Sequence, residues 1–282
     1  AFIKIQDGCN RFCSYCIIPY ARGRVRSKPL DDLIAEVTQL SEKGYKEIVL
    51  TGINLSAFGQ DINLHLCDAV EAVCAINGIE RVRLGSLEPE QLSEDVIIRL
   101  SKQQKLCPQF HLSLQSGCDE TLKRMNRHYT TEEYRTIVQN LRNAFDNAAI
   151  TTDIMVGFPG ETEEEFLDTL SAIDEFELDY SNTAAYSPRV KTKAAKWTDK
   201  FIDEETKFER LARLNEKNRQ ACLKSNEKCV GKTFEILVES YENKDGEIIL
   251  AGRAPNNKIV HFRGDKALVG EFVDVKITGA ST

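Results

Sequence analysis

The sequence has 282 residues, of which 41% are hydrophobic and 29% are charged, as in an ordinary soluble globular protein. It contains no apolar run long enough to span a bilayer and no pattern of a signal peptide, so we expect no membrane partner. The formal net charge of −7 argues against bulk electrostatic binding of nucleic acid, but it is compatible with a local basic face.

The cysteines and the start of the chain set two further expectations. Nine cysteines, mostly scattered and without a secretory signal, do not suit a disulfide framework. A reducing, cytoplasmic setting in which some cysteines bind a metal fits better. The chain begins at Ala1, inside an expected strand, and we therefore expect that an N-terminal part is missing from it.

From Phe2 to Tyr186 the sequence alternates between strand and helix patterns. Apolar, β-branched runs predict buried parallel strands. Helical spacing of apolar residues follows Pro29, and two capping-box patterns precede further helices, Thr130 with Glu133 and Thr162 with Glu165. Such repeated units predict an α/β barrel or an open α/β fold. The expected strands are residues 2–5, 47–51, 81–84, 110–114, 150–156 and, more weakly, 181–186.

The pattern changes after a long, charged helical stretch that runs from Asp203 to about Asn226. Short alternating runs follow, and the turn at residues 243–246 separates the first two. They predict a small all-β, barrel-like domain of about 60 residues. We expect one domain at residues 1–221, including the trailing helix, and a second at residues 222–282. The expected strands of the small domain are residues 233–239, 247–252, 258–262 and 271–278.

One motif carries most of the chemistry. Cys9, Cys13 and Cys16 follow the first expected strand with the spacing CxxxCxxC. Thiolates are soft ligands that suit iron–sulfur clusters, and three of them leave the fourth iron of a 4Fe-4S cubane open for catalysis. Structural zinc is the alternative, but zinc sites usually need a second Cys or His pair, and the histidines are distant in sequence.

This spacing after a first strand resembles the radical S-adenosylmethionine (SAM) superfamily, and Tyr15 matches the aromatic residue usual before the third cysteine. The resemblance implies that the open iron chelates the amino and carboxylate groups of SAM. It also implies that an electron, supplied by a donor, cleaves SAM to a 5′-deoxyadenosyl radical. The protein would supply binding and orientation, and beyond the cluster ligands no catalytic residue is expected.

The resemblance also implies where SAM is held, at the carboxyl ends of strands. Gly52 stands where the family contacts the methionine amino group through its backbone. Gln115 and Ser116 would face the ribose and the methionine, and a glycine-rich stretch would lie under the adenine. Glu88 is a further candidate, for which a solvated turn acid is the equal alternative. The candidate cofactor-binding residues are Tyr15, Gly52, Glu88, Gln115, Ser116, Asp153 and Gly157.

Longer stretches look like the methylthiotransferases of this superfamily. The small β domain then looks like their TRAM domain, an OB-like RNA-binding barrel. The expected fold is a radical SAM partial (β/α) barrel with a C-terminal all-β domain. The stretches that carry the resemblance are residues 5–10, 16–23, 114–127, 152–162 and 186–189.

Within that family the motifs look most like the type that adds a methylthio group at C2 of N6-threonylcarbamoyladenosine beside the anticodon of tRNA. The alternatives are the isopentenyladenosine type, the type that modifies ribosomal protein S12, and a non-catalytic RNA-binding protein with a cluster. We expect tRNA as partner and a monomeric chain. The basic residues of the small domain are candidates for phosphate contacts, with a solvated mixed surface as the equal alternative.

The family resemblance implies a second 4Fe-4S cluster, held by three more cysteines in an N-terminal domain. No second motif of this kind occurs in the sequence, and we interpret the other cysteines as buried or neutral thiols. We therefore expect the chain to bind one cluster and to cleave SAM, but not to complete methylthiolation.

Overall fold

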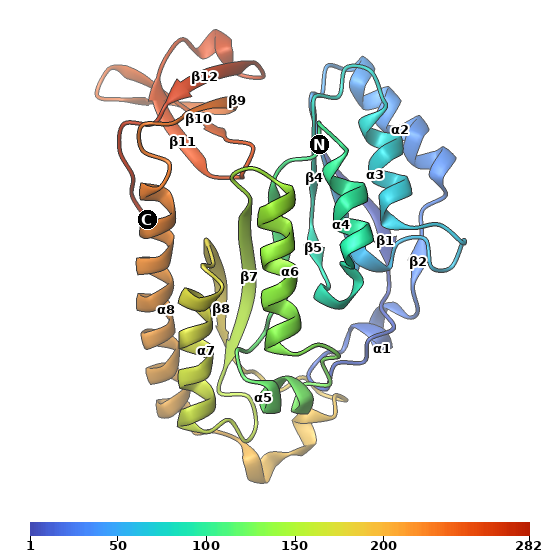
Figure 1. Ribbon diagram of the computed structural model, residues 1–282, viewed down its shortest axis with the longest axis vertical. Coiled ribbons are helices and arrows are strands. Elements are labelled where there is room, and N and C mark those ends of the chain that lie inside the picture. Colours follow the sequence, from blue (N-terminus) through green and yellow to red (C-terminus); the bar gives the residue numbers. More distant parts are fainter.

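The computed structural model describes all residues from Ala1 to Thr282 and contains a curved α/β half-barrel and a small β domain (Figure 1). The half-barrel is built from two four-stranded sheets, in the orders β2-β1-β3-β4 and β5-β6-β7-β8. All neighbours pair in parallel except β2 with β1. The strands are β1 (Phe2–Asp7), β2 (Arg26–Ser27), β3 (Glu47–Gly52), β4 (Arg81–Leu84), β5 (Ser86–Leu87), β6 (Gln109–Leu112), β7 (Ala149–Val156) and β8 (Tyr180–Ala185).

Helices between the strands cover the convex side of the sheets. Both predicted capping boxes are present, with Thr130 and Glu133 at the start of one helix and Thr162 and Glu165 at the start of the next. Pro29 lies at the N-cap, one residue before the helix that it was expected to begin. The helices are α1 (Ile18–Arg22), α2 (Leu30–Glu42), α3 (Leu66–Cys74), α4 (Glu94–Ser101), α5 (Asp119–Arg124), α6 (Thr131–Ala144), α7 (Glu163–Glu175) and α8 (Glu204–Glu227). No helix has both the length and the apolar character needed to cross a membrane.

The two faces of the strands differ in chemistry because successive side chains point to opposite sides. On the helix side Phe110, Leu112, Ile150 and Ile154 are buried in one continuous apolar core. Their neighbours along the strands, including His111 and Asp153, therefore face the concave side. The half-barrel consequently has a polar concave wall.

The small domain is an antiparallel sheet in the order β11-β10-β9-β12, built from β9 (Thr233–Lys244), β10 (Glu247–Arg253), β11 (Ile259–Arg263) and β12 (Phe272–Lys276). Positive φ angles at Asp245 (53°) and Gly246 (84°) close the first hairpin, as the turn residues predict. Strand β9 extends to Lys244, five residues beyond its expected end. The partial (β/α) barrel with a C-terminal all-β domain is thus confirmed.

Two buried arginines join the small domain to the amino-terminal end of the half-barrel. Arg81 donates to the backbone oxygens of Arg253 (3.1 Å) and Glu235 (2.5 Å). Arg83 donates to the backbone oxygens of Pro255 (2.7 Å) and Ala254 (2.8 Å). The small domain therefore seals this end, and Figure 1 shows it on the side away from α1. Helix α8 runs past residue 221 to Glu227, so the division at 221 and 222 stays a prediction.

Candidate functional site

The cysteine loop (residues 8–17) lies at the carboxyl end of β1, opposite the sealed end. The chain turns sharply at Gly8, where φ is 74° and an added Cβ would come within 1.9 Å of the backbone oxygen of Arg24. Only glycine fits such a close approach. The amide of Cys9 then bonds the oxygen of Gly23 (3.1 Å), which fixes the start of the loop against the return segment before β2.

The three thiols lie near one another, but not as ligands of a single ion. Burial, together with the proximity of Cys13 and Cys9, raises the pKa of Cys16. No three His, Cys, Asp or Glu side chains converge on one metal position. Zinc would bring each sulfur to about 2.3 Å from one ion, whereas a cubane carries each thiolate on its own iron. The donor set therefore fits a 4Fe-4S cluster with one open iron better than zinc.

A buried arginine stands beside this loop. Arg127 Nη1 lies 3.4 Å from Cys13 Sγ, and only 3% of the arginine side chain is exposed. Its Nη2 donates to Glu88 Oε2 (2.5 Å) and to the backbone oxygen of Ser113 (3.0 Å). Burial raises the pKa of Cys13, and the guanidinium opposes that shift. Arg127 thus supplies positive charge where thiolates would gather.

Sequence reasoning did not select Arg127 as a site residue. Glu88, which it did select, lies in the site as the ionic partner of Arg127 and is not a solvated turn acid. The two residues are 39 positions apart, so their pairing has no local signal. A buried charge beside a cysteine motif becomes visible only once the strand order is known.

The segment after β3 leaves one acceptor free next to Cys9. At Gly52 an added Cβ would lie 2.9 Å from the Gln6 side chain, so glycine lets β3 approach β1 closely. Asn54 accepts no hydrogen bond at its buried Oδ1, while its Nδ2 lies 3.7 Å from Cys9 Sγ. Buried polar atoms normally have partners. A free acceptor at this point fits a donor group such as the ammonium of SAM.

The segment after β6 presents its backbone more than its side chains. Gln115 has a positive φ of 70°, and its amide donates to the oxygen of Asp153 (2.8 Å). Ser116 is fully buried and its hydroxyl lies 3.1 Å from that of Thr169 on α7. The Ser116 side chain therefore faces the helix layer. Any contact of Ser116 with a ligand in the concave face would have to come from its backbone.

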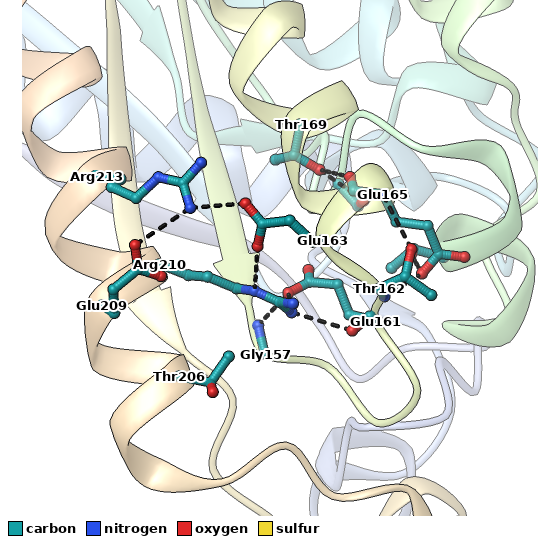
Figure 2. Close-up of polar contacts among 12 residues, drawn as sticks. Gly157, Glu161, Thr162, Glu163, Glu165, Thr169, Thr206, Glu209, Arg210 and Arg213 are labelled. Carbon is teal, nitrogen blue, oxygen red and sulfur yellow. Dashed lines mark hydrogen bonds and ion pairs between the residues drawn. The ribbon is translucent and has the colours of Figure 1, made fainter.

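The glycine loop (residues 157–160) is held from behind by α8 (Figure 2). The amide of Gly157 donates to Glu161 Oε2 (2.7 Å), and the same oxygen lies 2.8 Å from Arg210 Nη1. The Glu161 and Arg210 side chains are 0% and 6% exposed. Burial raises the pKa of Glu161, which the hydrogen bond from Gly157 and the contact with Arg210 oppose. The pair fixes the expected adenine loop, although the sequence did not reveal it.

Aromatic side chains connect this loop to the cysteine loop. Tyr15 packs edge-on against Phe158 (ring centroids 6.3 Å apart), and Phe158 does the same with Trp197 (6.1 Å). The amide of Ala194 bonds the oxygen of Ser14 (2.9 Å). The segment after β8 therefore closes over the cysteine loop and shields it. Tyr15 takes part in this cover.

The remaining cysteines form no second centre. Burial raises the pKa of Cys67, Cys74 and Cys107 to about 11 each, which keeps them as neutral thiols at ordinary pH. The others are Cys118, Cys222 and Cys229, and all nine are free.

The fold and the site together define a class, an α/β half-barrel with a three-thiolate centre at the carboxyl ends of its strands. Residues 3–173 match the Radical SAM superfamily model, and residues 227–282 match the TRAM domain model. Because the first match covers more than half of the sequence, the chain belongs to the radical SAM superfamily.

Curated relatives resemble the chain along its whole length. A tRNA-2-methylthio-N(6)-dimethylallyladenosine synthase of Clostridium botulinum (strain Langeland / NCTC 10281 / Type F) is 45% identical over 284 residues, which cover 100% of this chain and 63% of that protein. The protein of the same name from Alkaliphilus oremlandii (strain OhILAs) is 43% identical, covering 100% of this chain and 60% of the relative. The chain thus spans less than two thirds of either protein.

Solved structures share the fold at low identity. Coproporphyrinogen III oxidase (HemN) from Escherichia coli superposes with a TM-score of 0.58 and 12% identity, over 90% of this chain and 66% of that one. The radical SAM methyltransferase TsrM from Kitasatospora setae, with tryptophan and a SAM analogue bound, gives 0.57 and 17%, over 87% and 42%. These likenesses concern the fold alone.

Proposed function

We propose that the chain is the cofactor-binding and RNA-binding part of a methylthiotransferase that modifies N6-dimethylallyladenosine (isopentenyladenosine) beside the anticodon of tRNA. The observation that carries the proposal is the three-thiol loop beside Arg127 and the free acceptor of Asn54. It stands in a chain that shares 45% identity with a synthase named for that modification.

The threonylcarbamoyl substrate favoured by the sequence motifs is not supported by these relatives, which favour the isopentenyl alternative. The stretches that look like the threonylcarbamoyl type follow the cysteine motif, form β3 and follow β6, at residues 17–23, 48–53, 115–119 and 127–131. These segments surround the expected cofactor, which every type in the family shares. They therefore carry little information on the substituent at N6 of the substrate.

In the proposed enzyme Cys9, Cys13 and Cys16 hold the 4Fe-4S cluster, which when bound supplies the electron that cleaves SAM. Arg127 keeps a positive charge beside Cys13, which offsets the negative charge of the thiolates. Asn54 Oδ1, a buried acceptor without a partner, would accept from the ammonium group of SAM, and Gly52 would contribute through its backbone. The aromatic cover of Tyr15, Phe158 and Trp197 limits the access of water to the radical.

The small domain supplies RNA contacts at the sealed end. A cavity of about 1060 Å³ lies between this domain, the start of β8 and the end of α8. Arg253, Lys258, Arg263 and Lys276 are among its lining residues. Lys258 is bonded to Ser225 and Asn226, and Arg253 and Arg263 pair with Glu239 and Glu247. Lys276 has no such partner and is the cation best placed for a phosphate.

The substrate is tested with a chimera, because the chain spans 63% of its Clostridium botulinum relative. Residues 1–282 replace the aligned part of that synthase, and tRNA carrying either isopentenyladenosine or threonylcarbamoyladenosine is supplied with SAM and a reductant. Mass spectrometry of the nucleosides should find the methylthio group on isopentenyladenosine only. Methylthiolation of threonylcarbamoyladenosine instead would contradict the proposed substrate. Formation of 5′-deoxyadenosine without either product would contradict methylthiolation itself.

A further inference from the structure

A row of polar side chains crosses the concave wall below the glycine loop. It starts at Gln109 and His111 on β6, continues through Thr151 and Asp153 on β7, and ends at Asn182 on β8. Of these five residues only Asp153 belongs to the site described so far, as a candidate cofactor-binding residue whose backbone oxygen accepts from the amide of Gln115. Their alternation with the buried core residues puts them all on the concave side.

The hydrogen bonds of this row run in one direction, toward a carboxylate. Gln109 Nε2 donates to Thr151 Oγ1 (3.1 Å), and the same hydroxyl lies 3.1 Å from His111 Nδ1. His111 Nε2 lies 3.1 Å from Asp153 Oδ2. An N–H at Nε2 is present in the neutral tautomer that accepts from Thr151 and also in the protonated ring. In both forms His111 donates to Asp153.

Asp153 has a hydrogen-bond donor on its other side as well, and its carboxylate keeps vacant acceptor positions. Asn182 Nδ2 donates to Asp153 Oδ1 (3.0 Å), so each carboxylate oxygen has one fixed donor. A carboxylate offers about four acceptor positions, and 41% of the Asp153 side chain is exposed, against 14% for His111. Partial burial opposes the charge of Asp153, but the contacts with His111 and Asn182, followed by the charge of Arg127, lower its pKa, so the group is ionised at neutral pH. The wall thus presents an oriented acceptor with vacant positions.

An oriented carboxylate on the wall of a ligand-binding face matches a ligand with an N–H donor. The adenine of an N6-substituted adenosine carries one exocyclic N–H, whereas its ring nitrogens N1, N3 and N7 are acceptors. C2, the carbon modified in the proposed reaction, lies on the side of the purine away from the edge formed by N6 and N7. A base that directs this edge at β7 therefore turns C2 away from the wall.

We propose that Asp153, positioned by His111 and Asn182, accepts a hydrogen bond from the exocyclic N–H of the substrate adenine and so selects adenine at the modified position. The inference rests on the proposed function, because it takes an RNA adenosine as the ligand. The adenine of SAM has the same amino group and is the other source of this chemistry. The sequence motif alone pointed to SAM, so the experiment has one arm for each source.

The first arm measures binding of two anticodon stem-loops by fluorescence anisotropy at constant salt. They differ only in carrying adenosine or inosine at the modified position; inosine has an oxygen in place of the amino group and an N–H at N1. The wild-type chain should prefer adenosine by about tenfold or more, the usual value of a hydrogen bond to a charged group. In Asp153→Asn the preference should vanish or reverse, because an amide can donate to the inosine oxygen. Asp174→Asn, which alters an exposed pair with Lys217 on the helix layer, should behave as wild type.

The second arm measures the affinity of the cluster-loaded protein for SAM, which should be equal in Asp153→Asn and wild type. Weaker SAM binding with an unchanged adenosine preference would assign Asp153 to the cofactor and overturn the inference. If both SAM binding and the adenosine preference are unchanged, the polar row only links the strands, and the inference is overturned as well. A wild-type chain that binds both loops equally overturns the inference alone. One that binds neither loop overturns the proposed function with it.

Discussion

The two ends of the half-barrel each hold a buried arginine–glutamate pair, and the pairs differ in what surrounds them. At the sealed end Arg83 bonds Glu47 (2.9 Å), and its other donors go to the backbone of the small domain. At the cysteine end Arg127 bonds Glu88 (2.5 Å) and lies against the thiol of Cys13. The arginine side chains are almost equally buried, at 4% and 3% exposed.

Burial of an ion pair therefore does not identify a functional site in this molecule. At the sealed end the guanidinium of Arg83 forms hydrogen bonds to Glu47 and to the backbone of the small domain, which is a structural role. At the cysteine end the thiol of Cys13 lies next to the pair. A buried acceptor without a partner occurs at both ends, Glu47 Oε2 beside Arg83 and Asn54 Oδ1 beside Cys9, so the thiol is the feature that distinguishes the functional pair from the structural one. Substitutions at the two ends should accordingly affect different properties.

The largest effect is expected from Cys13→Ala, which removes one of three cluster ligands at the cysteine end. Bound iron and sulfide should fall at least tenfold after anaerobic reconstitution, because two thiolates are too few to retain a cubane. Cys222→Ala, a partly buried cysteine on α8, is the matched control and should keep the wild-type content. Equal iron in Cys13→Ala and wild type would remove this cysteine from the site.

Arg83→Met tests the sealed end. It leaves Glu47 buried without its partner and frees two backbone oxygens of the small domain. Breaking a buried pair in this way costs about 3–5 kcal/mol, so the free energy of unfolding in urea should fall by that amount. The iron content per folded chain should stay unchanged. Loss of iron from the folded variant would show that the two ends are not independent.

Arg127→Met applies the same change to the cysteine end. Formation of 5′-deoxyadenosine should slow by about tenfold or more, because a charge-assisted contact is lost beside Cys13. The midpoint potential of the reconstituted cluster should become more negative, since a nearby positive charge favours the reduced form. Arg127→Lys keeps the charge and should restore part of both properties. A potential identical in all three proteins would leave Arg127 with a structural use only.

The smallest effect is expected from Glu161→Gln, behind the glycine loop. The side-chain amide oxygen of the variant still accepts from the backbone N–H of Gly157, but the ionic contact with Arg210 is lost. SAM affinity should weaken by about threefold to tenfold, consistent with a single weakened hydrogen bond of roughly 1 kcal/mol. Glu209→Gln, an exposed glutamate on α8 that pairs with Arg213, is the control and should bind SAM normally. An unchanged SAM affinity in Glu161→Gln would show that the glycine loop does not contribute to cofactor binding.

The sequence predicts the elements of this fold well because their signals are local. Apolar periodicity locates β1, β3, β4, β6, β7 and β8, and the capping boxes at Thr130 and Thr162 are where their residue types predict. The strands that escape prediction, β2 and β5, have two residues each, too few for any period. Their formation depends on pairing with longer strands.

The candidate site is predicted only in part, because its polar groups come from distant segments. The spacing of the cysteines is local, so Cys9, Cys13 and Cys16 are found at once. Arg127 and Cys13 are separated by 114 positions, and Glu161 and Arg210 by 49. The orientation of Ser116 depends on the positive φ of Gln115, which favours no particular sequence outside glycine and asparagine.

The measurement that tests the central claim most directly is an anaerobic count of iron and sulfide on the wild-type chain, with electron paramagnetic resonance of the reduced cluster before and after addition of SAM. A 4Fe-4S cluster held by three thiolates, with its fourth iron open, predicts about four iron and four sulfide ions per chain and a spectrum that shifts when SAM binds. One zinc ion per chain, or a full cluster whose spectrum ignores SAM, would contradict it.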